Sequence, residues 1–192
     1  MIPFPDKKYN IIYADPPWSY NDAHCTGAAA QKYPTMSDGD LQSMPVNPAG
    51  GGGIAADDCV LFLWATYPKM QEALDLIKAW GFTYKSIAFQ WIKTNPSGNG
   101  YFFGLGRWTR GNTEPCLLAV KGKPKRQRAD VSQLVFSPLR QHSQKPDEVR
   151  DYIVQLMGDL PRIELFARSG ADGWDVWGNE APDKDEHQLR LY

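Results

Sequence analysis

Short, continuous apolar runs alternate with amphipathic segments along most of this chain, and no other feature constrains its fold as strongly. The runs at 9–15, 58–66 and 161–169 lack polar alternation, which is typical of strands covered on both faces. Two further strands are predicted at 84–94 and 115–122. Strands that alternate with helices predict an α/β protein with a mostly parallel central sheet and helices on both faces.

Two amphipathic segments supply the predicted helices. The segment 68–82 repeats apolar residues at helical spacing and ends at Gly81, a residue suited to the left-handed position that follows many helices. The segment 143–157 has Pro146 near its first turn with acidic residues beside it, where the helix dipole favours them. The loop at 95–114 is too long for a bare connector and is therefore a candidate substrate-binding segment.

Length and composition set the outer limits of the prediction. A chain of 192 residues is most simply one domain, which we place at 1–180, with an acidic and loosely ordered tail at 181–192. No stretch reaches the ~18 apolar residues of a membrane helix, and the N-terminus has no secretory pattern. The cysteines and histidines are scattered, so we expect neither a disulfide framework nor a metal site, and we expect a cytoplasmic protein. The net charge of −1 excludes only a uniformly basic nucleic-acid binder.

The tetrapeptide Asp15-Pro16-Pro17-Trp18 directly follows the first predicted strand. In open α/β sheets, ligands bind beyond the carboxyl ends of the strands. Asp15 adds a carboxylate at such an end, the two prolines offer carbonyl acceptors without N–H donors, and Trp18 adds a broad aromatic face. Together these groups suit a planar molecule that carries an exocyclic amino group. The motif DPP alone would favour an ordinary turn with a packed tryptophan.

This tetrapeptide resembles the catalytic motif of the MT-A70 family of S-adenosylmethionine-dependent adenine-N6 methyltransferases. Further segments resemble the family in the same order along the chain: YPTMSDGDLQSMPV, LFLWAT, WIKTN, GRWTRGNTEPCLLAVKG, HSQKPDEV, IELFARSG and GNE. The resemblance implies a Rossmann-like methyltransferase fold. The catalytic motif precedes the cofactor strand, which is the permuted order shared with β-type amino-methyltransferases.

The resemblance also implies a catalytic role for Asp15, Pro16, Pro17 and Trp18, with S-adenosylmethionine as the cofactor. The N6 lone pair of adenine is delocalised into the ring and is a poor nucleophile. Hydrogen bonds from the amine to the Asp15 carboxylate and the Pro16 carbonyl would favour a more electron-rich nitrogen, so positioning and electrostatics carry the reaction. Trp18, with Tyr33, would hold the target base after it leaves the stack.

For the cofactor, the resemblance implies contacts from residues in four motifs: Asp15, Lys145, Glu164, Arg168, Asn179 and Glu180. The first two would lie near the methionine end, Glu164 and Arg168 near the ribose or adenine, and the last two beside the adenosine. Two alternatives stay open: Lys145 could be a solvated residue of a first helical turn, and Glu164 could be a structural strand residue with a partner.

Nucleic-acid contacts are expected from cations and aromatic residues on the loops. Phosphate partners are expected at Arg107, Arg110, Arg140 and the basic segment 121–128, and Trp108 belongs to an aromatic group suited to stacking. The alternative is a solvated basic loop beside a packed aromatic cluster. By resemblance, Glu114 lies near the target pocket, although as a loop residue it could simply face water.

Among possible substrates, the sequence favours DNA over RNA, because the chain is compact and lacks the long extensions and zinc modules of the messenger-RNA enzymes. The expected protein is a monomeric or homodimeric adenine-N6 methyltransferase that binds nucleic acid and no membrane. A non-catalytic family member is the alternative from another class. Intact Asp15 and Trp18 argue against that alternative.

Overall fold

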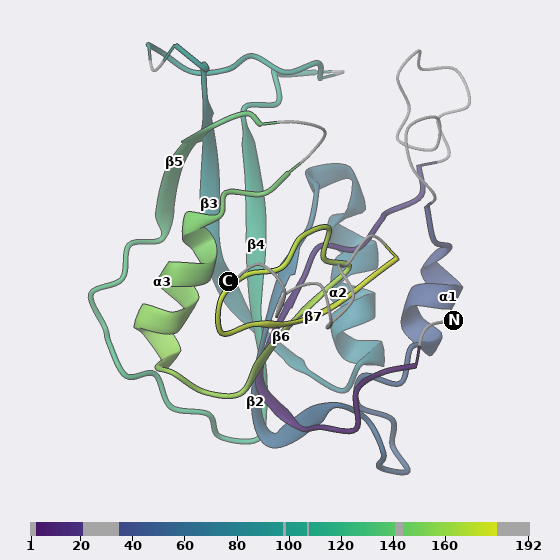
Figure 1. The fold of residues 1–192 in the computed structure, drawn as a ribbon. Helices are drawn as coiled ribbons and strands as arrows, with labels where there is room; N and C mark the ends of the chain where they lie inside the picture. The colour runs from purple at the N-terminus through teal and green to yellow at the C-terminus, as the bar shows by residue number, and fades with distance from the viewer. Residues whose placement is uncertain (1–2, 21–34, 98, 107, 141–143, 180–192) are drawn as a thin grey trace, which may run out of the picture.

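The computed structural model describes residues 3–20, 35–97, 99–106, 108–140 and 144–179. These residues form one seven-stranded sheet in the order β5-β3-β4-β2-β1-β6-β7 (Figure 1). Its strands are β1 (Tyr9–Ala14), β2 (Ala55–Trp64), β3 (Thr83–Thr94), β4 (Thr113–Lys121), β5 (Leu134–Pro138), β6 (Arg162–Leu165) and β7 (Asp175–Trp177).

All of these strands except β4 run in one direction. β1 pairs in parallel with β2 and β6, β6 pairs in parallel with β7, and β3 pairs in parallel with β5. β4 is antiparallel to both β2 and β3, so the start of β4 lies at the edge where its neighbours end. The predicted mostly parallel sheet is confirmed, and the single reversed strand brings residues near 93 and 114 together.

Helices cover both faces of the sheet, as predicted. α1 (Asp38–Ser43) and α2 (Met70–Ala79) lie on one face, and α3 (Glu148–Met157) lies on the other (Figure 1). Ile12 packs in the core beneath α1 and α2, whereas its neighbour Ile11 packs in the core beneath α3. Because successive residues of β1 point to opposite faces, a strand covered on both sides must be apolar throughout.

The helix predicted at 68–82 is observed as a 3₁₀ turn, η2 (Tyr67–Lys69), followed by α2. Gly81 follows this helix with a φ of 73°, in the left-handed region that glycine favours. The helix predicted to begin at 143 begins instead at Glu148. The sequence patterns missed the three short elements α1, β5 and β7.

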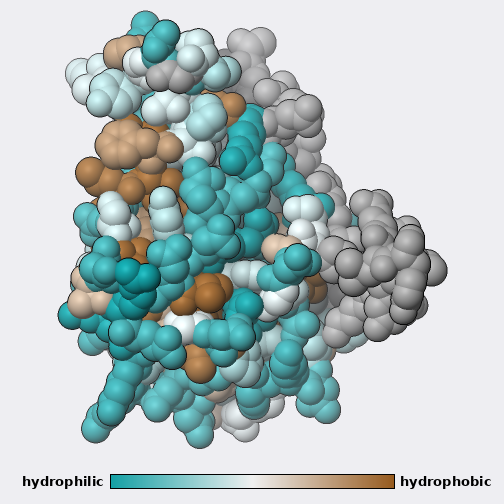
Figure 2. Space-filling view, turned by 60° about the vertical axis from the view of Figure 1, so that its left-hand side comes forward, coloured by the Kyte–Doolittle hydropathy of each residue, from teal (hydrophilic) through white to brown (hydrophobic). Residues whose placement is uncertain are grey.

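The edge strand β5 has one buried and one exposed face. Val135 packs against α3, whereas Leu134 and Phe136 are 48% and 57% exposed on the opposite face. Figure 2 shows apolar side chains on the upper part of this side of the molecule. Within the described residues, no helix has the length and apolar character that a membrane crossing requires.

Candidate active site

A pocket of about 570 Å³ lies at the carboxyl edge of the parallel strands. Asp15 follows β1, Thr66 lies beyond β2, and Phe166 follows β6, so all three reach the pocket from strand ends. A second pocket of about 310 Å³ adjoins the first, and both are lined by Asp15, Lys145, Phe166 and Arg168. Carboxyl ends of parallel strands are where open α/β sheets bind ligands.

The DPPW segment forms a tight turn at the wall of this pocket. The backbone N–H of Trp18 donates to the Pro16 carbonyl at 2.9 Å. The indole N–H of Trp18 donates to the Trp64 carbonyl at 3.3 Å, and the Trp18 residue is 5% exposed. Trp18 is therefore fixed to the core at the wall of the pocket, and its role in holding the target base stays a prediction.

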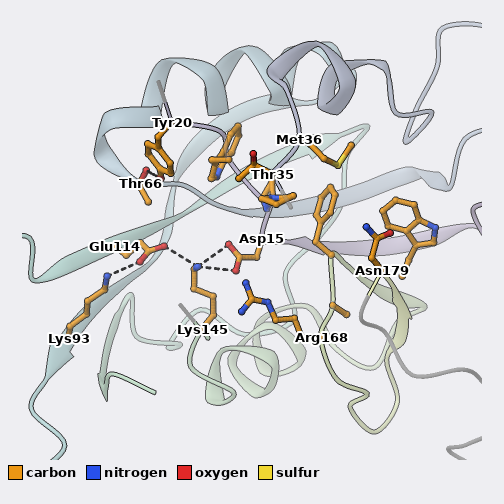
Figure 3. Close-up of a pocket in the computed structure, with 17 residues that line it drawn as sticks. Asp15, Tyr20, Thr35, Met36, Thr66, Lys93, Glu114, Lys145, Arg168 and Asn179 are labelled. Atoms are coloured by element: carbon orange, nitrogen blue, oxygen red, sulfur yellow. Dashed lines mark hydrogen bonds and ion pairs between the residues drawn. The ribbon is translucent and has the colours of Figure 1, made fainter. Parts of the chain in front are cut away.

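Four charged side chains form a row across the pocket (Figure 3). The Nζ of Lys145 lies 2.9 Å from each carboxylate oxygen of Asp15 and 3.1 Å from Oε1 of Glu114. The other oxygen of Glu114 accepts from Lys93 at 2.9 Å. Figure 3 also shows the guanidinium of Arg168 pointing toward Asp15. The alternative in which Lys145 is a solvated surface residue is excluded, because its side chain is 10% exposed and bonded to two acids.

Burial and charge shift the pKa values of this row in different directions. Burial raises the pKa of the Asp15 carboxyl above its ordinary value, and the ammonium of Lys145 opposes that shift. Burial would also raise the pKa of Glu114, but Lys145 and Lys93 together hold it below its ordinary value. Burial would lower the pKa of Lys145, but the carboxylates of Asp15 and Glu114 hold it above its ordinary value. Lys145 therefore stays positively charged at neutral pH.

The other end of the pocket is aromatic and closely packed. Phe166 has a φ of 63°, an uncommon conformation for a bulky residue and one that clusters at functional sites. Its ring meets Trp177 edge-on, with 5.7 Å between the ring centroids. Gly178 permits the close approach, because a Cβ there would lie 2.7 Å from the Ala167 carbonyl oxygen. Asn179 lines the same end of the pocket, as Figure 3 shows.

Glu164 lies in the second pocket and already has a partner. Its two carboxylate oxygens accept from Arg150 of α3 at 2.6 and 3.0 Å, and the residue is 8% exposed. Arg150 is therefore the partner expected if Glu164 is a structural strand residue, as one of the two open alternatives held. A ribose hydroxyl would have to share a carboxylate that Arg150 already holds.

The predicted nucleic-acid contacts are spread over three places. Trp108 and Arg110 are exposed on the β3–β4 loop, whose two ends lie at the pocket. Arg140 instead pairs with Asp147 and Glu148 at the start of α3, so its charge is balanced within the protein. Tyr33, Arg107 and Glu180 lie outside the described residues.

The basic segment 121–128 lies at the opposite edge of the sheet from the pocket. Lys121 pairs with Cys59 at the beginning of β2, whereas Glu114 is at the pocket end of β4. Seven strand residues separate the two positions by about 24 Å. Phosphate contacts from this segment were predicted from its charge alone, and its position away from the pocket argues against contacts beside the target base.

Several residues of the site were missed by sequence reasoning. Lys93 and Arg150 hold the charged side chains, whereas Phe166 and Trp177 form the aromatic end. Glu114 was treated as a loop residue, but β4 begins at Thr113 and Glu114 is 8% exposed. The ion-pair partners carried no local signal, whereas Phe166 and Trp177 lie inside or beside motifs that were recognised.

The mostly parallel sheet and the pocket at its carboxyl edge define an α/β protein of the Rossmann-like methyltransferase class. The MT-A70 family model matches residues 9–180. The chain is 40% identical over 201 residues to the type II methyltransferase M.MunI from Mycoplasma sp. That alignment covers 93% of this chain and 80% of M.MunI. The chain belongs to the MT-A70 family, as its motifs predicted.

More distant relatives are much longer proteins. The chain is 32% identical over 177 residues to an N(6)-adenosine-methyltransferase MT-A70-like protein of Drosophila melanogaster. It is 30% identical over 178 residues to the human N(6)-adenosine-methyltransferase catalytic subunit METTL3. Each alignment covers 90% of this chain but only 27% and 28% of the two relatives, so the chain spans about a quarter of their length.

Proposed function

We propose that this protein transfers a methyl group from S-adenosylmethionine to the N6 amine of adenine in DNA. One observation carries the proposal: the Asp15 carboxylate stands in a 570 Å³ pocket with Lys145 bonded to both of its oxygens. The family membership and the intact DPPW turn support the same reaction. The proposed site unites Asp15, Pro16, Lys145 and Asn179 around one ligand volume.

The two joined pockets fit the chemistry of S-adenosylmethionine. The cofactor's amino-acid end carries one carboxylate and one ammonium, which match the Lys145 cation and the Asp15 carboxylate. Its adenine is flat and apolar with polar edges, which matches the aromatic pair Phe166 and Trp177 beside the Asn179 amide. When bound, this cofactor supplies an electrophilic methyl group on a sulfonium. Arg168 lines both pockets and is proposed to contact the ribose.

The residues of the turn are proposed to prepare the amine for attack. The Asp15 carboxylate would accept one N–H of the adenine amine. The Pro16 carbonyl would accept the other with its second lone pair, since Trp18 N–H uses the first. These two hydrogen bonds would favour a more tetrahedral N6, whose lone pair is no longer delocalised into the ring and is available for attack. The bound cofactor would supply the methyl group to N6 and leave as a neutral thioether, and the Asp15 carboxylate would accept the N6 proton that is released.

Lys145 is proposed to keep Asp15 in the ionised form that accepts hydrogen bonds. Burial alone would raise the pKa of Asp15, and the lysine opposes this rise. Glu114 and Lys93 hold Lys145 in place from the other side. The charged row is therefore interpreted as a support for one carboxylate.

DNA is preferred over RNA as the proposed substrate because the alignment with M.MunI covers far more of the relative than the alignments with the N(6)-adenosine-methyltransferases do. M.MunI, a type II methyltransferase, matches over most of both chains, and we take the type II designation to favour DNA. The N(6)-adenosine-methyltransferases match over only about a quarter of their length. RNA is the second candidate, because the turn chemistry is the same for either sugar.

The proposal is tested with isotopically labelled S-adenosylmethionine on DNA, RNA and protein, followed by nucleoside mass spectrometry. We expect N6-methyldeoxyadenosine from DNA and no label in protein. N6-methyladenosine from RNA alone would replace the substrate, and label on no nucleic acid would refute the proposed function. The Asp15→Asn variant is the background control.

A further inference from the structure

Trp108 differs from every other tryptophan of the chain. It is 95% exposed, and its neighbour Leu105 is 92% exposed. The other tryptophans range from 0% to 8% exposed: Trp18, Trp64, Trp80, Trp91, Trp174 and Trp177. Phe103 of the same loop is 68% exposed, and exposed apolar side chains that gather on one loop mark a candidate binding surface.

The loop that carries Trp108 is a two-armed projection whose conformation is fixed by backbone hydrogen bonds. Phe102 N–H donates to the Lys93 carbonyl at 2.8 Å, which holds the start of the first arm against the end of β3. Gly104 N–H donates to the Gly111 carbonyl at 3.2 Å, which joins the two arms on either side of the tip. A side chain at Gly106 would collide with the Thr109 carbonyl, so glycine there permits a tight tip. The tip of this two-armed loop presents Leu105 and Trp108 to solvent.

Both ends of the loop lie at the proposed active site. Lys93 and Glu114 flank it, both line the main pocket, and their side chains pair at 2.9 Å. In Figure 1 the loop rises beyond the carboxyl edge of the sheet, at the top of the view. The segment 95–112 contains two arginines and no acid. An apolar tip flanked by cations fits stacked bases between phosphates better than it fits an acidic or purely apolar partner.

We infer that Trp108 is a wedge that enters the space left in a DNA duplex when the target adenine is extruded. This inference rests on the proposed function. The amine of a paired adenine lies inside the stack and cannot reach Asp15 until the nucleotide is flipped out. An indole stacked on the bases that remain replaces part of the lost stacking, as inserted apolar side chains do in other duplex-deforming proteins. Trp108 is thus a positioning residue that acts on the duplex and not on the reacting atoms.

The first test compares the Trp108→Ala variant on two forms of one oligonucleotide. On the duplex, the single-turnover methylation rate should fall about 10- to 100-fold, the worth of one base–aromatic stack. On the single strand, where no gap has to be filled, the rate should stay within about 3-fold of wild type. Equal losses on both forms would overturn the wedge. The control is Tyr84→Ala, which removes a 42% exposed aromatic from the far end of β3.

The second test follows Trp108 itself. Because the other six tryptophans are buried, fluorescence that acrylamide readily quenches should come from Trp108. A duplex with the methylation site should protect that fraction, and 2-aminopurine at the target position should brighten with wild type but not with Trp108→Ala. Full quenching in saturating duplex would overturn the wedge. So would a change in the sedimentation of Trp108→Ala alone, because the tip would then be a contact between copies of the chain.

The outcomes separate the wedge from the proposed function. If wild-type protein methylates neither the duplex nor the single strand, the proposed function fails and the wedge fails with it. If wild type methylates both and Trp108→Ala loses rate equally on both, only the wedge fails.

Discussion

Replacing Lys145 with methionine removes the cation that joins the two acids of the pocket. Breaking a buried ion pair costs about 3–5 kcal/mol, because the remaining charge is left without a partner. In the variant, Glu114 would still pair with Lys93 at 2.9 Å, and the Asp15 side chain is 28% exposed, so water can solvate part of its charge. We therefore expect the variant to lose about 2–3 kcal/mol of unfolding free energy, below that range. In a domain of this size, such a loss lowers Tm by about 4–12 °C.

Denaturant unfolding at pH 7 measures this loss. Lys145 and Lys93 hold the pKa of Glu114 below its ordinary value. The contribution of the Glu114 carboxylate to the free energy of unfolding is therefore complete above about pH 4.3, the pKa of an unfolded glutamate, and is lost only as the pH falls through the lower folded-state pKa. The matched control is Lys123→Met, a change of an exposed lysine at the opposite edge of the sheet, which should stay within about 0.5 kcal/mol. Adding Asp15→Asn to Lys145→Met should recover part of the loss, since it removes the unpaired charge.

The same variant also reports on the reaction. Lys145 opposes the rise in the pKa of Asp15, so its removal should raise that pKa and move the acidic limb of the methylation rate to higher pH. Calorimetry should show weaker binding of S-adenosylmethionine. If the variant keeps wild-type stability and its acidic limb does not move, the charged row does not support Asp15 and the electrostatic reasoning is wrong.

Three further predictions concern other parts of the molecule. Neutralising Arg107 and Arg110 should reduce the slope of log affinity against log salt for duplex DNA by about 2, whereas neutralising the segment 121–128 should leave it unchanged; the reverse result would place DNA on the far edge. Gly178→Ala should weaken S-adenosylmethionine binding at least about 10-fold by calorimetry, because the added methyl meets the Ala167 carbonyl oxygen at 2.7 Å, and unchanged affinity would move the cofactor elsewhere. Trp18→Ala should destabilise the fold by about 3–5 kcal/mol in denaturant, since this indole is 5% exposed and packed in the core, and a loss below 1 kcal/mol would contradict that burial.

The sequence carried the parts of this fold that depend on local pattern. β1 and β2 are covered on both faces, so their continuous apolar runs could be recognised without knowledge of their partners. β7 has three residues and β5 has five with an exposed apolar face, so neither carries enough periodicity to be found. Asp15 and Lys145 were found because each lies in a short contiguous motif.

Long-range pairs and strand direction were not readable from the sequence. Lys93 meets Glu114 because β4 runs antiparallel to β3, and nothing in either segment states that direction. The same reversal carries Lys121 to the far edge of the sheet, away from the loop with which its charge had grouped it. Arg150 meets Glu164 because α3 packs over β6, a contact set by tertiary structure.

The single-turnover methylation rate of Asp15→Asn at saturating S-adenosylmethionine tests the central claim most directly. Asparagine keeps the shape of the side chain and leaves Lys145 paired with Glu114 at 3.1 Å, so the variant should fold, which its Tm verifies. If the carboxylate prepares the adenine amine, the rate should fall about 10²–10³-fold on duplex and single-stranded DNA alike. A folded Asp15→Asn protein that methylates adenine within about 3-fold of the wild-type rate would contradict the mechanism.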